Sequence, residues 1–164
     1  PFMKVTSDFT SQVNQVIKGF RNDDVLVGIP ESETARQQQE DGGNINNATL
    51  LALNEFGSPA NNIPARPVMA LGIRKAQPEI IECFKAGARQ ALSKGLPALT
   101  PMFNRVGIIA SVSIKKVINS QEGILPPSPV TLDIRESKGF KGTKALIVTG
   151  QMRNAITYVV RGKT

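Results

Sequence analysis

The sequence predicts an α+β fold, in which a small antiparallel sheet packs against two or more long helices, with extended loops between them. Apolar residues recur at helical spacing over long segments, and short β-branched runs occur near both ends of the chain. The 164 residues, of which 40% are hydrophobic, suit a single domain spanning 1–164. A chain of this length buries roughly 70% of its unfolded surface, so it needs neither a disulfide nor a metal to fold.

The beginning of the chain is expected to hold a helix, a strand and a loop. A helix is predicted from about residue 7 to 20, with Ser7 as its N-cap, because its apolar side chains share one face. β-branched residues at alternate positions predict a strand from Val25 to Ile29, which Pro30 stops. Residues 31–47 are polar and have no period that could bury a face, so a flexible loop is expected, which a partner could order.

A short helix followed by a stiff segment is predicted next. Asn47 could cap a helix from Ala48 to Phe56, which ends at Gly57. Proline fixes its own φ and pushes the preceding residue into an extended conformation. The segment Ile63-Pro64-Ala65-Arg66-Pro67 should therefore be rigid, and a rigid segment that aims one arginine suits a contact. The simpler interpretation is that the prolines only end the preceding segment and that the arginine is solvated.

Two long helices are expected in the middle of the chain. A helical pattern resumes after the stiff segment, and Pro78 suits the first turn of a helix that Gly95 ends. A second long helix follows Pro97, and the short connection allows the two to pack as an antiparallel pair. Cys83 lies next to the apolar stripe of the first helix, which favours a buried, inert thiol. The predicted inner faces are Ile80, Ile81, Phe84, Ala88, Ala91 and Leu92, and then Leu99, Phe103, Val106, Ile109, Ala110, Ile114 and Val117.

The last third of the chain alternates short helices with loops and ends in a strand. Ser128 can cap a short helix that starts at Pro129. Residues 137–144 are rich in glycine and lysine and are expected to form a flexible loop. Thr149 or Gly150 can cap one or two further helical turns. The β-branched run from Ile156 to Val160 then predicts a strand that pairs with the first one.

Composition excludes several classes of function. The chain has no histidine and one cysteine, so it can form neither a Ser–His or Cys–His nucleophile pair nor a structural zinc tetrahedron. Its 13 acidic residues form no close constellation, and the pair Asp23-Asp24 lies at an expected turn, where it suits the end of a helix or the start of a strand. We therefore expect no enzyme, no catalytic residue, no cofactor and no metal site. No run of about 18 apolar residues exists and the N-terminus lacks a signal-peptide core, so a soluble protein without a membrane partner is expected.

The net charge of +7 is unevenly distributed. Residues 1–60 contain 4 basic and 8 acidic side chains, a net charge of −4, and the remaining residues contain 16 basic and 5 acidic ones, a net charge of +11. Such polarity fits either a polyanionic partner or a head-to-tail contact between the acidic and the basic surface of two copies. The simpler interpretation is a solvated basic face.

Two stretches in this order resemble a family of tailed-bacteriophage proteins, whose members are described as minor tail components, tail-completion or neck proteins, or virion-morphogenesis proteins. The first stretch is Glu55-Phe56-Gly57 followed by Ile63-Pro64-Ala65-Arg66-Pro67. The second is Pro126-Pro127-Ser128-Pro129-Val130-Thr131, a basic loop, and the run from Leu146 to Tyr158, which is similar to the family pattern L-S-P-x-T … L-x-D-T-G-x-L-R-x-S-I. The resemblance spans roughly residues 47–161. This chain has Val148 where the family often has an aspartate, and its loop at 31–47 is long for the family.

The resemblance implies a structural virion protein that forms a ring of identical subunits, six-fold or twelve-fold, in the neck or tail end. Such a ring would be assembled in the host cytoplasm, would contact other neck, connector or tail-terminator proteins, and would let genomic DNA pass through its lumen without reading its sequence. The implied interface residues are Phe56, Ile63, Pro64, Arg66, Pro67, Thr149 and Arg153. Lys138, Lys141 and Lys144 are the candidates for the DNA-facing lumen, although they could equally serve solubility.

Two alternatives stay open. A small protein could use the basic C-terminal part to bind nucleic acid without sequence specificity. The sequence shows no zinc site and no aromatic-rich strand pair, which argues against sequence-specific binding. An enzyme that uses carboxylates, such as a nuclease or a glycosidase, is less favoured because the candidate acids lie in unrelated segments.

Overall fold

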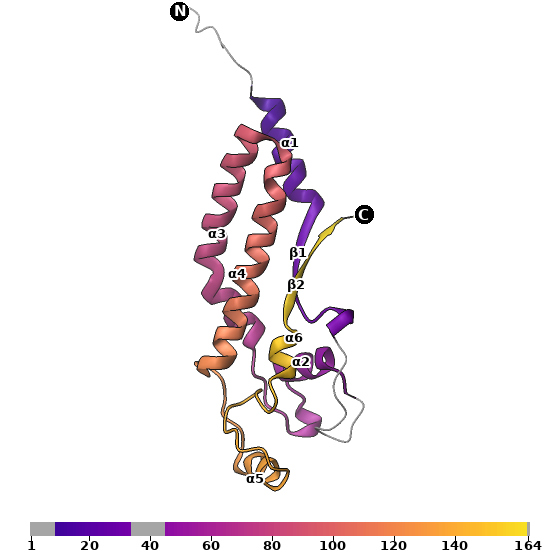
Figure 1. Cartoon of the computed structure of the whole chain (residues 1–164), viewed down its shortest axis with the longest axis vertical. Helices are drawn as coiled ribbons and strands as arrows, with labels where there is room; N and C mark the ends of the chain where they lie inside the picture. Colours follow the sequence, from indigo (N-terminus) through magenta and orange to yellow (C-terminus); the bar gives the residue numbers. More distant parts are fainter. Residues whose placement is uncertain (1–8, 34–44, 164) are drawn as a thin grey trace, which may run out of the picture.

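The structure is a computed structural model that describes residues 9–33 and 45–163. The molecule is elongated, with two long antiparallel helices running along most of its length (Figure 1). These are α3 (Val68–Lys94) and α4 (Leu99–Ser120), joined by the 3-10 turn η3 (Leu96–Ala98). Helix α1 (Thr10–Asn22) packs at the end where this turn lies. The antiparallel pair and the α+β class agree with the prediction.

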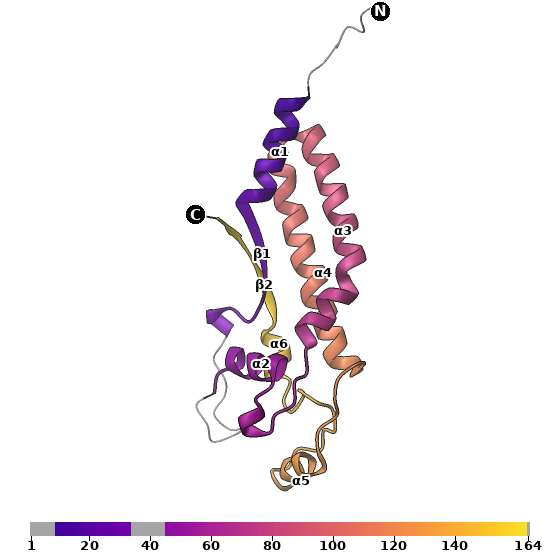
Figure 2. The same ribbon diagram turned by 180° about the vertical axis from the view of Figure 1, so that it is seen from behind.

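The shorter elements gather at the opposite end of the helix pair (Figures 1 and 2). They are α2 (Asn47–Phe56), the 3-10 turn η2 (Pro59–Asn61), α5 (Pro129–Ser137) and α6 (Gln151–Ala155). A further 3-10 turn, η1 (Glu31–Glu33), follows the first strand. None of the helices in the described parts of the chain is both long and apolar enough to cross a membrane.

Strands β1 (Asp23–Gly28) and β2 (Thr157–Gly162) form the predicted antiparallel pair, with Leu26 opposite Val159. One face of this two-stranded sheet packs against α4 (Figures 1 and 2). A Cβ atom on Gly107 of α4 would lie 2.2 Å from the ring of Tyr158, so glycine is needed for the helix and the ring to approach this closely. The hydroxyl of Tyr158 also donates a hydrogen bond to Asn104 Oδ1 at 3.3 Å.

Small residues let α3 and α4 approach each other, which corrects the predicted inner face of α3. Ile81 and Leu92 are each 43% exposed. Ala91 is buried as predicted, and the other buried positions of α3 are Val68, Gly72, Ala76 and Gly87. A Cβ atom on Gly72 would come within 2.5 Å of the Ile114 side chain, so the facing helix occupies the space that a larger residue would need.

The sequence predicted Pro78 in the first turn of a helix, but Pro78 lies inside α3. The helix begins at Val68, which is fully buried, and Ala76 is also buried. We infer that this packing outweighs the cost of about 3 kcal/mol for a proline inside a helix. Proline has no N–H, so the backbone carbonyl of Arg74 lacks the hydrogen bond that position 78 would otherwise donate. Arg74 and Pro78 are both exposed, so water can solvate this carbonyl.

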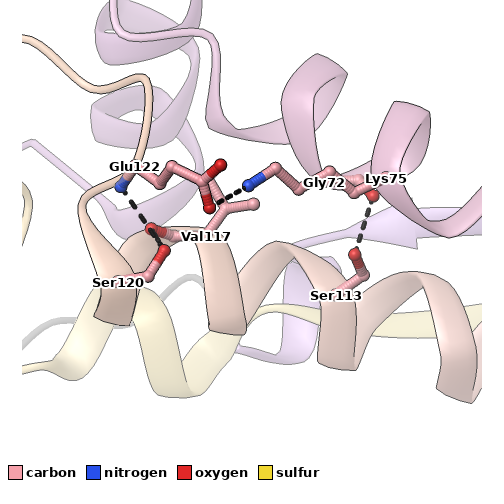
Figure 3. A network of polar contacts seen from close by, with 6 residues as sticks. All are labelled: Gly72, Lys75, Ser113, Val117, Ser120 and Glu122. Carbon is pink, nitrogen blue, oxygen red and sulfur yellow. Dashed lines mark hydrogen bonds and ion pairs between the residues drawn. The ribbon is translucent and has the colours of Figure 1, made fainter.

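Polar contacts also connect the two long helices (Figure 3). The hydroxyl of Ser113 donates a hydrogen bond to the backbone oxygen of Gly72 at 2.8 Å. Lys75 of α3 forms an ion pair with Glu122, just beyond the end of α4. Both side chains of the pair are largely exposed, so its contribution to stability is at most about 1 kcal/mol.

Two apolar clusters hold the ends of the molecule. At the α1 end, the rings of Phe20, Phe84 and Phe103 pack at centroid distances of 5.9–6.5 Å, mutually inclined by 57–75°. The other cluster joins α2, α6 and the loop residues near them to the long helices. Its buried residues are Leu51, Val68, Ile114, Val117, Ile118, Ile124, Ala145, Met152 and Ile156.

The helix ends confirm some predicted caps and correct one. Ser128 accepts a hydrogen bond from the backbone N–H of Thr131 at 3.2 Å, as predicted. For α2, however, the cap is Asn46, whose side chain accepts from Thr49 N at 2.7 Å. Asn47 is instead the first residue of the helix and is 2% exposed.

Two predictions fall wholly or mostly outside the described residues. Helix α1 begins at Thr10, with Phe9 at its N-cap position, and the predicted cap Ser7 lies outside the described residues. Within the loop predicted at 31–47, only the two ends are described, and residues 34–44 are not.

Candidate functional site

The stiff segment at 63–67 and the two later stretches, 126–131 and 146–158, meet in one groove of about 720 Å³. The segment after α2 forms one wall, and α5 with the turn before it forms another. Residues 145–152 complete the groove. The lining is mostly apolar and includes Leu50, Ile63, Pro64, Leu125, Pro126, Pro127, Ile134, Phe140, Leu146, Val148 and Met152.

Arg66 connects the two walls. Its Nε donates to the backbone oxygen of Leu125 at 2.8 Å, and its Nη2 donates to that of Pro126 at 3.1 Å. Its backbone N–H also donates to the oxygen of Asn54 at 2.6 Å. Partial burial lowers the pKa of the Arg66 guanidinium, although arginine stays charged in proteins. The side chain of Arg66 therefore binds backbone oxygens of its own chain, and its predicted role at an interface stays a prediction.

Glu55 has a role that the sequence did not reveal. Its carboxylate oxygens accept hydrogen bonds from Met69 N at 2.8 Å and Ala70 N at 2.9 Å. These are first-turn N–H groups of α3, whose own N-cap residue, Pro67, offers no side-chain acceptor. A negative charge is also favourable at this end of a helix. The sequence separations of 14 and 15 residues hide this cap from any local capping pattern.

The segment between Glu55 and Arg66 is closed by its own backbone. Ser58 and Ile63 exchange two backbone hydrogen bonds, of 2.8 and 3.0 Å, across the turn η2. Gly57 has a φ of +74°, and a Cβ atom there would lie 2.8 Å from Ala65 N, so both its conformation and its surroundings require glycine. This closed loop, together with the prolines, favours the predicted stiffness of the segment, which stays a prediction.

The wall made by α5 is held by Arg135, which donates to the backbone oxygen of Lys144 at 2.8 Å. Phe140 N donates to Arg135 O at 2.9 Å, which folds the chain back at the end of the helix. On the floor, Leu146 has a φ of +62°, an unusual conformation for a bulky residue. Strained backbone of this kind clusters at binding and switch regions of proteins. The flexibility predicted for residues 137–144 stays a prediction.

The structure separates the predicted interface residues into two groups. Ile63, Pro64, Arg66 and Thr149 line the groove, whereas Phe56, Pro67 and Arg153 do not. Phe56 is 80% exposed at the end of α2. Arg153 donates to Asn119 Oδ1 at 2.8 Å and so fastens α6 to the last turn of α4.

The three predicted lumen lysines also differ in their surroundings. Lys138 is exposed and lines the groove. Lys141 is exposed and lies outside the lining. Lys144 Nζ donates to the backbone oxygen of Asn119 at 2.7 Å, near the C-terminal end of α4, where a cation is favourable.

The charges around the groove have one sign. Arg66, Arg135 and Lys138 line it, and no aspartate or glutamate is found among the described residues of its lining. An apolar groove with cations at its walls suits a segment that carries both apolar groups and carboxylates. Within residues 9–33 and 45–163, no three His, Cys, Asp or Glu side chains come together as a metal site. Comparisons of the chain with protein-family models, with curated proteins and with solved structures give no match.

Proposed function

We propose that the chain is a structural virion protein of a tailed bacteriophage. It acts as one subunit of an oligomeric ring that completes the tail at the neck or head–tail junction, with a lumen through which DNA passes. The observation that carries this proposal is the groove. The two stretches similar to phage neck and tail-completion proteins, far apart in sequence, meet there through Arg66 and the turn at Leu125 and Pro126.

Exposed apolar side chains in rows support the same proposal. On α1, Phe9, Val13 and Ile17 follow one another at intervals of four and are 41–61% exposed. On α4, Ile108 and Val112 have the same spacing and are 50% and 43% exposed. Isolated exposed apolar residues are common, but rows of them mark surfaces that other proteins cover. In a ring, neighbouring subunits would cover these rows.

The DNA-facing role belongs to Lys138 and Lys141, because Lys144 already binds a helix-end carbonyl. Lysines on a loop can attract passing phosphates without reading bases. A lumen must let the genome move, so a few exposed cations suit it better than a tightly binding surface.

A second candidate, a nucleic-acid-binding protein without sequence specificity, has one observation in its favour. Helix α4 contains three basic residues and no acidic residue. Two of them, Arg105 and Lys116, are exposed on the side of Ile108 and Val112. Such a face could bind phosphates directly, with the helix itself as the contact surface.

Electron microscopy and sedimentation velocity of the purified full chain test the proposal. We expect rings or discrete oligomers for the wild type and a shift toward monomer for Phe56→Ser, which removes an exposed apolar contact without touching the core. Gln90→Ser, at an exposed position of α3, serves as the control and should assemble normally.

Two further observations separate the candidates. Virions that lack the protein should show full heads and tails that fail to join. A monodisperse monomer together with normal virions would overturn the proposal. Tight binding of DNA to filters by a monomer, with steep dependence on salt concentration, would favour the second candidate instead.

A further inference from the structure

Helix α5 carries its charges on two different sides. The side with Ile134 and Arg135 lines the groove. Successive residues of a helix are turned by about 100°, so Asp133 and Glu136 lie on the side away from the groove. Val130, three residues before Asp133, borders that side, is 66% exposed and does not line the groove. Val130, Asp133 and Glu136 together form the outer side of α5, which is apolar at one end and acidic beyond it.

The outer side of α5 is uncovered in the single chain. Asp133 and Glu136 are both exposed, and neither carboxylate has a hydrogen bond or an ion pair within the part of the chain that the structure describes. None of the nine residues of α5 is buried. Figures 1 and 2 show the helix beyond the end of the long helix pair, where it projects from the rest of the molecule. A projecting helix with an unoccupied acidic side can reach another molecule.

Helix α4 carries a face of the opposite charge. Ile108 and Val112 lie one turn apart and are 50% and 43% exposed. Arg105 precedes Ile108 by three residues and Lys116 follows Val112 by four, so a cation stands at each end of this apolar row. Both cations are exposed, and neither has a hydrogen bond or an ion pair with another described residue. These four residues form the outer face of α4, a helix that contains no acidic residue.

We propose that α5 of one copy packs its outer side against the outer face of α4 of a neighbouring copy. Val130 covers the row of Ile108 and Val112, and the two carboxylates lie between Arg105 and Lys116. At a rise of about 1.5 Å per residue, these cations start about 16 Å apart along α4, and their long side chains can reach inward to carboxylates placed between them. The inference rests on the ring proposed above and names two surfaces that join its subunits.

The two surfaces belong to different parts of the same chain, so the contact is head to tail. Its repetition gives a closed ring when the rotation between copies allows it. Lys138 and Lys141 follow α5 in sequence and take no part in the contact, so they stay available for the lumen. Ion pairs beside covered apolar groups are partly desolvated and therefore stronger than ion pairs in open water, although salt should still weaken the contact.

Charge reversal on each surface tests the contact. In sedimentation velocity of the full chain, Asp133→Lys/Glu136→Lys and Arg105→Glu/Lys116→Glu should each weaken self-association by about tenfold or more. The first variant should not weaken the fold, because it removes a carboxylate from the last turn of α5 and places a cation there. Circular dichroism should show native helix content for both variants.

Two control variants carry the same changes of charge at exposed positions elsewhere. Glu33→Lys/Glu79→Lys matches the reversal on α5, and Arg89→Glu/Lys94→Glu matches the reversal on α4. Both should associate as the wild type does. Weakening of association by the controls as much as by the interface variants would show an effect of net charge and would overturn the proposed contact.

Mixing the two interface variants tests which surfaces meet. In copies that alternate, the reversed α5 of one variant faces the reversed α4 of the other, and the two unchanged surfaces face each other in the next contact. Every contact then joins opposite charges. We expect the mixture to recover association at a concentration where each variant alone is monomeric. Loss of association without recovery on mixing would overturn the pairing of α5 with α4.

Further outcomes separate this inference from the proposed function. Rings that persist in both interface variants would overturn the contact and leave the ring proposal standing. A wild-type chain that is monomeric at every concentration and salt level would overturn both. A monomer that binds DNA on filters and loses this binding in Arg105→Glu/Lys116→Glu would also overturn both, since the outer face of α4 would then be a surface for phosphates.

Discussion

The carboxylate of Glu55 accepts a hydrogen bond from the backbone N–H of Met69 at 2.8 Å, so the end of one helix caps the beginning of another. Replacing Glu55 by alanine should lower the free energy of unfolding by about 1–2 kcal/mol, since it removes both cap bonds and a favourable charge. Glu55→Gln should lose less, because its amide oxygen still accepts one bond. Urea unfolding measures both. Glu79→Ala, at an exposed site within α3, is the control and should stay within about 0.5 kcal/mol of wild type.

Arg66 should not tolerate lysine. Lysine keeps the charge but cannot donate to the oxygens of Leu125 and Pro126 through a planar fork, so we expect a loss of about 1–3 kcal/mol. Amide hydrogen exchange should also rise in peptides covering 57–66 and 121–128. Arg74→Lys, exposed on α3, should leave both readouts unchanged. Unaltered exchange in Arg66→Lys would show that the bridge between the groove walls does not order them.

Gly107 and Gly28 form a matched pair for testing the packing of α4 on the sheet. A Cβ atom at Gly107 would meet the Tyr158 ring at 2.2 Å, whereas one at Gly28 would have nothing within 4 Å. Gly107→Ala should therefore destabilise the protein by about 1–3 kcal/mol. Gly28→Ala should be neutral or stabilising by up to about 1 kcal/mol.

Native-state fluorescence gives a second readout of this packing. Tyr158 is the only tyrosine and the chain has no tryptophan, so tyrosine emission reports this one ring. The emission should change in Gly107→Ala and stay the same in Gly28→Ala. Equal stabilities and equal spectra would contradict the packing.

Cys83 should react slowly in the folded protein. Burial, which outweighs the opposing effect of Arg105, raises the pKa of its thiol, and its Sγ lies 3.8 Å from Met102 O. At pH 8 the folded chain therefore holds less thiolate than the unfolded chain, and the thiolate is the reactive form. The thiol's contribution to stability is in place below its ordinary pKa and is lost as pH rises through the raised, folded-state pKa. Iodoacetamide labelling followed by mass spectrometry should be slower in buffer than in urea, and equal rates would refute this.

Local patterns predicted much of the fold. The helix pair, the two strands and the glycines that end α2 and α3 follow from periodicity and turn chemistry, which depend only on neighbours in sequence. The inner face of α3 was not predictable in this way. Gly72 and Gly87 carry no hydrophobic signal, and their value depends on Ile114 and Met102 of another helix. The position of Pro78 was predicted wrongly for a related reason. Helix α3 begins at Val68, ten residues before the proline, and the burial of Val68 depends on tertiary contacts that no local pattern reveals.

The candidate site was predicted only in part. The stiffness around Pro64 and the importance of Arg66 are visible in the sequence, because proline restricts its neighbours in every context. The groove itself was not visible, since it needs Leu125 and Pro126 to lie beside a segment about 60 residues earlier. The cap by Glu55 was missed because it spans 14 residues to Met69, well beyond a local capping motif.

The acceptors of Arg66 are both main-chain carbonyls, and this has a consequence for how such proteins diverge. Any residue at position 125 or 126 supplies the same oxygen, provided that the turn keeps its shape. The donors to Glu55, the N–H groups of Met69 and Ala70, are equally independent of side-chain identity. Paired substitutions, by which contacts are usually detected in aligned sequences, would therefore not link these positions. Two of the contacts that build the groove leave no co-variation, so relatives could keep the same architecture while their sequences diverge around it.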